Sequence, residues 1–266
     1  MISVITGASA GIGAAAAGEL SRRGHRVVLV GRDESRLKAV ADGLTGSEAD
    51  VLTCDYTSLD DVRRLAAALR ERYGRIAVLA NNAGVMSPRR QITVDGHELM
   101  VQVNHLAPFL LTHSLTDRVD RVVTTSSRAG RSGRLDPDDL SREQRRWNGW
   151  LQYGDTKQAN ALFTVALAAR GVAATCFHPG VIRSGFAAET WIMRMFLAVP
   201  GYAKPPEYGA RTLVHLATHA DGEKRAGRYF AKQAPERVPP TMSDPDLADR
   251  LWRASLDAIG GGPSAG

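Results

Sequence analysis

The chain alternates between short apolar runs and longer segments in which apolar residues recur three and four positions apart. Short runs bounded by turn residues predict buried strands, and the three-and-four spacing predicts helices with one apolar face. The predicted strands cover residues 2–5, 26–30, 50–55, 76–80, 121–125, 173–177 and 227–231. The predicted helices cover residues 14–20, 34–41, 58–73, 96–112, 153–170, 207–220 and 246–259. This alternation predicts an α/β fold: a single domain with a doubly wound, mostly parallel sheet of about seven strands and helices on both faces.

Two stretches depart from the alternation. Residues 128–152 are polar and are interpreted as a surface insertion near the mouth of a site. Residues 183–206 are rich in Trp, Met and Phe, which suits a substrate lid, a subunit contact or a membrane-surface element. The lid is favoured because the stretch follows a strand end that should face a ligand. We therefore expect a main domain over residues 1–240, with a C-terminal helix and flexible tail over residues 241–266.

A glycine-rich turn joins the first strand to the first helix. Gly7, Gly11 and Gly13 follow the pattern Gly-x-x-x-Gly-x-Gly rather than Gly-x-Gly-x-x-Gly. Such a turn lets main-chain N–H groups approach a phosphate, and the helix N-terminus adds a positive dipole end. The turn predicts a nucleotide phosphate site.

The end of the second strand indicates which nucleotide is bound. An acidic residue there holds a ribose 2′-hydroxyl, whereas an Arg accommodates a 2′-phosphate. The residues after Val30 are Gly31 and Arg32. This favours NADP over NAD; the alternative is that Arg32 is only a solvent-facing turn residue.

Tyr153 and Lys157 lie four apart on a predicted helix, so their side chains project to the same side. A nearby cation favours the phenolate and lowers the pKa of a Tyr. A Tyr tuned in this way exchanges a proton with an alcohol or carbonyl oxygen. The alternative is a surface helix with an exposed Tyr and Lys.

A second polar residue, Asn104, lies in an apolar helical pattern and needs buried partners or a ligand, and Pro108 should bend that helix.

Composition is that of an ordinary globular protein, with 266 residues, 44% hydrophobic, 23% charged and a formal charge of +6. The Arg residues are scattered, which favours a solvated surface with some attraction for anionic ligands over a nucleic-acid site. No run approaches the roughly 18 apolar residues of a membrane span. The first strand begins at residue 2, so no signal peptide or N-terminal anchor is expected.

Cysteine and histidine usage favours neither a metal nor a disulfide. Cys54 and Cys176 are expected to be reduced and structural, in a cytoplasmic protein. His215 and His219 lie four apart without the intervening Glu of a zinc-protease helix, and are interpreted as surface or packing residues. No metal site is predicted.

Taken in order, residues 6–13, residues 81–84, Asn104, Ser127 and the Tyr153-x-x-x-Lys157 pair resemble the short-chain dehydrogenase/reductase family. The resemblance runs from Thr6 to about Phe230 and implies a Rossmann-type sheet. Residues 95–98, 103–112 and 157–164, with the long interval between Ser127 and Tyr153, are similar to the retinol-dehydrogenase-like and protochlorophyllide-reductase-like branch.

The resemblance implies an NADP(H)-dependent oxidoreductase that interconverts a ketone or aldehyde and an alcohol by hydride transfer. Tyr153 would act as general acid or base, and Ser127, or failing it Ser126, would hydrogen-bond the substrate oxygen. Lys157 would hold the nicotinamide ribose and lower the pKa of Tyr153, while Asn104 would position a water that connects Lys157 to solvent. The alternative is a non-catalytic NADP(H)-binding sensor or partner protein of the same fold.

The resemblance also implies which positions contact the cofactor. They are Gly7, Ser9, Ala10, Gly11, Ile12, Gly13, Arg32, Asp55, Tyr56, Asn81, Ala83, Gly84, Asn104, Tyr153, Lys157, Pro179, Gly180, Val181, Ile182 and Ser184. Ser184 stands where the family usually has Thr and keeps the hydroxyl. Ala77 replaces a common acidic residue, and Ala10 supplies no second basic residue, so the NADP preference depends chiefly on Arg32. The substrate is expected to be a small lipophilic carbonyl or alcohol, and a homo-oligomer is possible.

Overall fold

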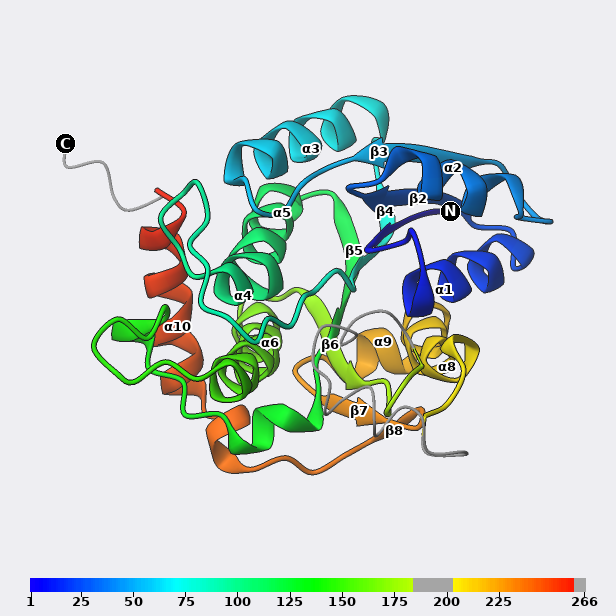
Figure 1. Cartoon of the computed structure of the whole chain (residues 1–266). Coiled ribbons are helices and arrows are strands. Elements are labelled where there is room, and N and C mark those ends of the chain that lie inside the picture. The colour runs from blue at the N-terminus through cyan, green and yellow to red at the C-terminus, as the bar shows by residue number, and fades with distance from the viewer. Residues whose placement is uncertain (184–202, 261–266) are drawn as a thin grey trace.

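In the computed structural model, which describes residues 1–183 and 203–260, a single sheet runs through the molecule (Figure 1). Its strand order over those residues is β3-β2-β1-β4-β5-β6-β7-β8, all parallel except the β7–β8 pair. The strands are β1 (Ile2–Thr6), β2 (Arg26–Gly31), β3 (Ala49–Thr53), β4 (Ile76–Asn81), β5 (Val119–Thr125), β6 (Ala173–His178), β7 (Tyr229–Ala231) and β8 (Ala234–Pro235). The predicted doubly wound sheet is confirmed, and the short β8 is added to it because two residues are too few to form a pattern.

Helices cover both faces of the sheet. They are α1 (Gly11–Arg22), α2 (Glu34–Asp42), α3 (Leu59–Arg72), α4 (Leu99–Val101), α5 (Ala107–Leu115), α6 (Gly149–Ala169), α8 (Pro206–Thr218), α9 (Asp221–Lys224) and α10 (Pro245–Ala258). Helices α3, α5 and α6 pack in the core on one face, whereas α1 and α8 pack in the core on the other.

The strand residues explain the two cores. Along β2, Val28 and Val30 belong to the core under α3, α5 and α6, while Val27 and Leu29 belong to the core under α1 and α8. Successive side chains of a strand point to opposite faces, so a sheet covered on both faces needs a continuous apolar run. This is why the strands read as unbroken apolar segments.

The predicted helix over residues 96–112 begins later, at Leu99, and is irregular around Pro108 as expected. Helix α4 leads into a π-helical turn, Gln102–Leu106, and only then into α5. Pro108, in the first turn of α5, has no N–H to donate to the carbonyl of residue 104, so regular α-helical bonding cannot continue through this point. A π turn lets the chain continue without that bond.

Glu98 caps α4 and carries a pH dependence. Its carboxylate accepts hydrogen bonds from the main-chain N–H groups of Met100 (2.9 Å) and Val101 (3.0 Å), and burial raises its pKa from 4.5 to about 6. The folded-state pKa lies above the unfolded one, so its stability contribution is full below pH 4.5 and is lost as pH rises through 6. We expect this group to lower the free energy of unfolding by about 2 kcal/mol across that window.

Urea denaturation at pH 4.5, 5.5 and 7 measures this effect. Glu98→Gln keeps an acceptor oxygen without the charge, so the variant should lack the fall. Parallel pH dependence in the two proteins would contradict the assignment.

The C-terminal helix belongs to the main core. Trp252 of α10 meets Phe109 with ring centres 4.9 Å apart, and the Arg170 guanidinium lies 4.1 Å from the Trp252 ring centre. The His105 ring nitrogen Nε2 lies 2.8 Å from the Ser255 hydroxyl oxygen. Helix α10 therefore supports α5 and α6 from outside; the predicted tail, residues 261–266, lies outside the described part of the chain.

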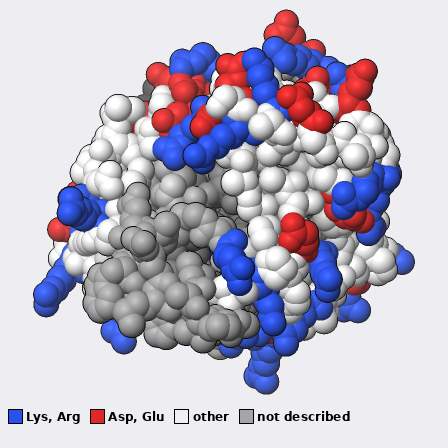
Figure 2. Space-filling view, turned by 45° about the vertical axis from the view of Figure 1, so that its right-hand side comes forward, with Lys and Arg blue, Asp and Glu red and all other residues white. Residues whose placement is uncertain are grey.

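The cysteines, the paired histidines and the surface charges bear on smaller expectations. Cys54 and Cys176 are free and buried, and burial raises the pKa of each thiol to about 12. His215, in the last turn of α8, has its Nε2 atom 3.0 Å from a carboxylate oxygen of Asp221, the first residue of α9. On the face shown in Figure 2, acidic and basic side chains are interspersed. Among the described helices, none combines the length and apolarity needed to cross a bilayer.

Candidate active site

The ends of β1 and β4 are tied together by Thr6. Its hydroxyl donates to the carbonyl of Ala80 (3.2 Å) and accepts from the main-chain N–H groups of Asn82 and Ala83 (both 3.0 Å). These two strands flank the point where the strand order reverses, which is where doubly wound sheets bind their ligands. Neither Thr6 nor Asn82 was among the predicted site residues.

The glycine-rich turn lies directly over this point. Gly7 has φ +66° and a Cβ there would lie 2.9 Å from the Ala83 Cα, while a Cβ on Gly13 would lie 2.3 Å from the Gly7 carbonyl oxygen. Both positions therefore exclude a side chain. The Asn82 amide nitrogen donates to the Thr6 carbonyl (3.0 Å), which holds the turn against β4.

The N-terminus of α1 has the character of an anion site. Ala10 occupies the N-cap without a capping side chain, and the first turn carries no acidic residue. Its first N–H groups are therefore left without partners in the helix, at the positive end of the dipole. This arrangement fits the phosphates of a dinucleotide.

Arg32 follows β2 directly, is exposed, and makes no ion pair with any described residue. Its neighbour Asp33 caps α2 by accepting from the Arg36 main-chain N–H (3.0 Å) and also accepts from the Ser35 hydroxyl (2.6 Å). The acidic residue at this strand end is therefore engaged in the helix cap, and Arg32 remains available to an anion.

Helix α6 carries the Tyr–Lys pair, and it begins at Gly149 rather than at the predicted Tyr153. The Asn148 side chain caps it by accepting from the main-chain N–H groups of Trp150 (3.0 Å) and Leu151 (3.1 Å). Asn is a strong N-cap residue, so the helix starts one turn earlier than the apolar pattern indicated. Tyr153 consequently lies in the second turn, where its main chain is fixed.

Lys157 lies beneath Tyr153. Its Nζ atom is 5.4 Å from the centre of the Tyr153 ring and 3.4 Å from the Thr125 carbonyl oxygen. The side chain is buried, and this burial lowers the pKa of Lys157 to about 8. The Thr125 carbonyl also accepts from the side-chain amide of Asn160 (3.1 Å), another residue that the sequence did not single out.

The pKa of Tyr153 moves in the direction opposite to the expectation. Burial raises it, while a hydrogen bond with Ser127 acts to lower it. Desolvation of the phenolate outweighs the hydrogen bond with Ser127 in this packed site. Tyr153 therefore holds its proton at neutral pH, which suits it to donate a proton to a carbonyl oxygen.

The two serines after β5 have different roles. The buried Ser126 hydroxyl donates to the Lys157 carbonyl (2.7 Å) and so ties β5 to α6. Ser127 accepts from the Ala129 main-chain N–H (3.2 Å) and shares a hydrogen bond with Tyr153. This geometry favours Ser127 over Ser126 as the hydroxyl beside the reacting oxygen.

Asn104 is buried, and its side chain is fully engaged by protein. Its Oδ1 atom accepts from the Val85 N–H (2.7 Å), and its Nδ2 atom donates to the Val85 carbonyl (2.9 Å) and to the Thr156 hydroxyl (3.1 Å). The predicted water would therefore have to meet the main-chain carbonyl of Asn104, which Pro108 cannot satisfy, rather than the side chain. That role stays a prediction.

The other predicted contacts also follow strand ends, but some of their side chains face the protein. Tyr56 is buried in the core, and the Asn81 amide donates to the Thr112 hydroxyl (2.9 Å). Asp55 accepts from the Thr57 N–H (2.9 Å) and so caps the turn that follows β3. Any ligand contact from Tyr56 or Asn81 must therefore come from the main chain.

The segment after β6 completes the rim. The Val181 carbonyl accepts from the Lys204 N–H (2.8 Å), and the Arg183 N–H donates to the Lys204 carbonyl (2.8 Å). A Cβ on Gly209 would lie 3.0 Å from both Ile12 and Ile182, so α8 packs closely beside the glycine-rich turn. Ser184 and most of the predicted lid over residues 183–206 lie outside the described residues.

Comparison with known proteins agrees with this geometry. The family model for short chain dehydrogenase matches residues 1–194. The chain is 40% identical over 264 residues to a candidate daunorubicin C-13 ketoreductase of Streptomyces sp. (strain C5), covering 97% of this chain and 92% of that one. It is 33% identical to human retinol dehydrogenase 13, covering 97% and 84%.

A crystal structure of an uncharacterised protein from Mycobacterium paratuberculosis superposes with a TM-score of 0.81. The two chains are 32% identical, and the match covers 98% of this chain and 94% of that one. The resemblance seen in the sequence is therefore confirmed, and the chain belongs to the short-chain dehydrogenase/reductase family, as an enzyme that acts on CH–OH groups with a nicotinamide cofactor.

Proposed function

We propose that this protein is an NADP(H)-dependent reductase of lipophilic ketones or aldehydes, working reversibly on the corresponding alcohols, with Tyr153 as general acid and base. The observation that carries the proposal is the buried Tyr153 phenol, hydrogen-bonded to Ser127 and 5.4 Å from the Lys157 ammonium. This group lies at the carboxyl ends of the strands, as do the N-terminus of α1 and Arg32, which pairs with no acidic residue in the described part of the chain.

Some of these residues would bind the cofactor, and others would hold the substrate oxygen and transfer its proton. The glycine-rich turn and the α1 N-terminus would hold the pyrophosphate, and Arg32 the 2′-phosphate. The nicotinamide, when bound, supplies or accepts the hydride. Ser127 would hold the substrate oxygen, and Tyr153 would give that oxygen its proton in reduction or remove it in oxidation. Lys157 places a positive charge under the phenol as negative charge develops on it.

The proposed substrate class rests on the surroundings of Tyr153. The Trp150 ring centre lies 6.2 Å from that of Tyr153, and Trp150 is an exposed large apolar side chain. An exposed aromatic ring beside a polar reaction centre suits an apolar ligand. The names of the relatives, a ketoreductase of daunorubicin and a retinol dehydrogenase, agree with a lipophilic substrate.

A non-catalytic NADP(H)-binding protein of the same fold is the alternative. Binding alone would not need a buried phenol that shares a hydrogen bond with a serine and lies over a lysine. Nucleotide binding without turnover on a broad panel of ketones and aldehydes would favour this alternative.

The cofactor preference is tested at Arg32. Replacing Arg32 by Ala should weaken NADPH binding by roughly 10- to 100-fold, because a charge-assisted hydrogen bond to phosphate contributes about 1.5–3 kcal/mol. NADH binding should change little. Nucleotide fluorescence titration of both proteins with both nucleotides measures the difference.

The matched control is Arg75→Ala. Arg75 precedes β4 at the amino end of the strand, away from the proposed site, and pairs with Asp120 on β5. The Arg75→Ala substitution removes the same charge without touching the proposed site, so NADPH affinity should stay at the wild-type value. Preference of the wild type for NADH would overturn the assignment to Arg32.

A further inference from the structure

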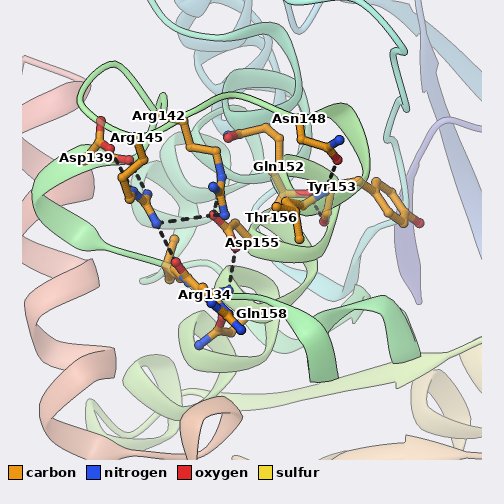
Figure 3. Close-up of polar contacts among 12 residues, drawn as sticks. Arg134, Asp139, Arg142, Arg145, Asn148, Gln152, Tyr153, Asp155, Thr156 and Gln158 are labelled. Atoms are coloured by element: carbon orange, nitrogen blue, oxygen red, sulfur yellow. Dashed lines mark hydrogen bonds and ion pairs between the residues drawn. The ribbon is translucent and has the colours of Figure 1, made fainter.

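Helix α6 has two polar faces with different partners. Tyr153 and Lys157 lie four apart on the face that meets Ser127 and β5. Gln152, Asp155 and Gln158 recur three apart and so share one face of the helix. That face is the opposite one, because Asp155 lies two residues, about 200°, beyond Tyr153. In Figure 3 the Tyr153 ring points away from the cluster around Asp155.

Asp155 lies at the centre of this opposite face, which we call the rear face of α6. It is 1% exposed and accepts hydrogen bonds from the Arg134 main-chain N–H (2.7 Å) and from Arg142 Nε (2.9 Å). Arg142 Nη2 lies 2.8 Å from the same carboxylate oxygen, and the side chain of Arg142 is only 5% exposed. Both charges are thus removed from water, and each is stabilised by the opposite charge of the other.

A second ion pair closes the cluster. Arg145 Nε donates to Asp139 (2.8 Å) and its Nη1 donates to the Arg134 carbonyl (2.6 Å). Arg145 Nη1 also lies 3.8 Å from the Asp155 carboxylate, which links the two pairs (Figure 3). Arg142 has φ +48°, a left-handed conformation that is costly for a residue with a side chain. The chain adopts it where the Arg142 guanidinium reaches Asp155.

The two glutamines hold the main chain of the same segment. Gln152 Nε2 donates to the Leu140 carbonyl (2.9 Å), and Gln158 Oε1 accepts from the Leu135 N–H (3.0 Å). We call residues 134–145 the brace. The brace is therefore fastened to three successive positions along the rear of α6, beside the two turns that carry Tyr153 and Lys157.

A buried ion pair contributes little net stability compared with apolar packing, yet losing one partner is costly, so it fixes one arrangement of the groups that it joins. Proton transfer requires such precision, because a displacement of about 1 Å can lower a rate roughly a hundredfold.

We propose that Asp155 is a positioning residue for catalysis, which acts through the brace to fix the first turns of α6 and hence the Tyr153 hydroxyl beside Ser127. This inference rests on the proposed function of Tyr153. It assigns residues 134–145, which the sequence pattern had suggested to be a surface insertion, to the support of the reaction centre.

The test is Asp155→Asn, which keeps an acceptor for the Arg134 N–H and removes the charge that faces Arg142. With a carbonyl substrate and NADPH established for the wild type, kcat per folded molecule should fall about tenfold, while KM changes less than about threefold. Hydrogen exchange of the peptide over residues 150–158 should become faster, and this readout needs no turnover.

The matched control is Asp50→Asn. Asp50 also accepts hydrogen bonds from an Arg and another side chain, Arg26 (2.8 Å) and Tyr73 (2.7 Å), but it lies on β3. Its loss should lower stability without changing kcat or exchange at residues 150–158. An unchanged kcat in folded Asp155→Asn, or an equal fall in Asp50→Asn, would overturn the proposal.

A second variant and the exchange measurement separate a folding defect from a failure of the proposal. If Asp155→Asn does not fold, Arg142→Lys keeps the charge but loses the second donor, and a smaller fall in kcat, about threefold, is expected with faster exchange at residues 150–158. An unchanged kcat in that variant would overturn the proposal. If the wild type turns over no carbonyl, the proposed function fails, whereas the exchange experiment still decides whether the brace fixes α6.

Discussion

Replacing Tyr153 by Phe is expected to reduce kcat by roughly a hundred- to ten-thousandfold, the range that general acid–base groups contribute. The variant removes only the hydroxyl that would give its proton to the substrate oxygen. Because burial raises the pKa of this phenol, its proton is present throughout the neutral range. Steady-state reduction of a carbonyl substrate with NADPH, followed from pH 6 to 9, measures the loss.

Binding and folding should be preserved in this variant. NADPH affinity should stay within about threefold of the wild type, since a Tyr-to-Phe change is nearly isosteric. The matched control is Tyr73→Phe, which removes another largely buried hydroxyl, one that donates to Asp50 (2.7 Å). It should keep wild-type kcat. Full turnover by Tyr153→Phe would show that another group transfers the proton.

Replacing Lys157 by Met is expected to lower activity and raise stability together. The Nζ atom lies 5.4 Å from the Tyr153 ring centre, so its removal withdraws the only charge that the structure places under the phenol within the described residues. We expect kcat to fall by about a hundredfold or more. A loss of this size without unfolding would separate Lys157 from residues that only support the fold.

The stability effect follows from the pKa of Lys157. Burial lowers it from 10.5 to about 8, so the folded protein binds its proton less readily than the unfolded chain does. The free energy of unfolding should therefore rise as pH increases from 8 to 10.5, by about 3 kcal/mol from this group. At pH 7 the wild type carries the whole penalty, and Lys157→Met, of similar length but uncharged, should be more stable.

Urea denaturation without nucleotide, at pH 7, 9 and 10.5, measures the pH dependence of the wild type and the stability of Lys157→Met. The control is Lys38→Met, because Lys38 is exposed and pairs with Glu34 on the surface of α2. It should change neither kcat nor the pH dependence. A Lys157→Met variant that is less stable than the wild type at pH 7 would show that the ammonium is stabilised in the fold rather than penalised.

Some features of the site could be predicted because they depend on residue spacing alone. Gly7 and Gly13 lie where a side chain would collide with the main chain, and they can be recognised in the sequence because both are glycines. Arg32 follows a strand that its apolar run defines. Tyr153 and Lys157 share a helix face because they are four residues apart. None of these inferences needs knowledge of distant contacts.

Other features were missed because their partners are remote in the sequence. Thr6 joins residues 80, 82 and 83 across two strands, and no local pattern distinguishes its hydroxyl from a surface threonine. The residues of the brace appeared to be a polar surface insertion. Asp139 and Arg142 are in fact buried, because their charges meet those of Arg145 and Asp155.

The sequence by itself therefore determined the fold class, the order of its elements and the family, since apolar periodicity and glycine positions are local properties of the chain. Only the tertiary structure decided that Ser127 rather than Ser126 faces Tyr153, that the Asn104 side chain is used by Val85 and Thr156, and that the pKa of Tyr153 rises. The reason is physical: desolvation and hydrogen-bond partners depend on every element packed around a group, and no single segment of the chain specifies them.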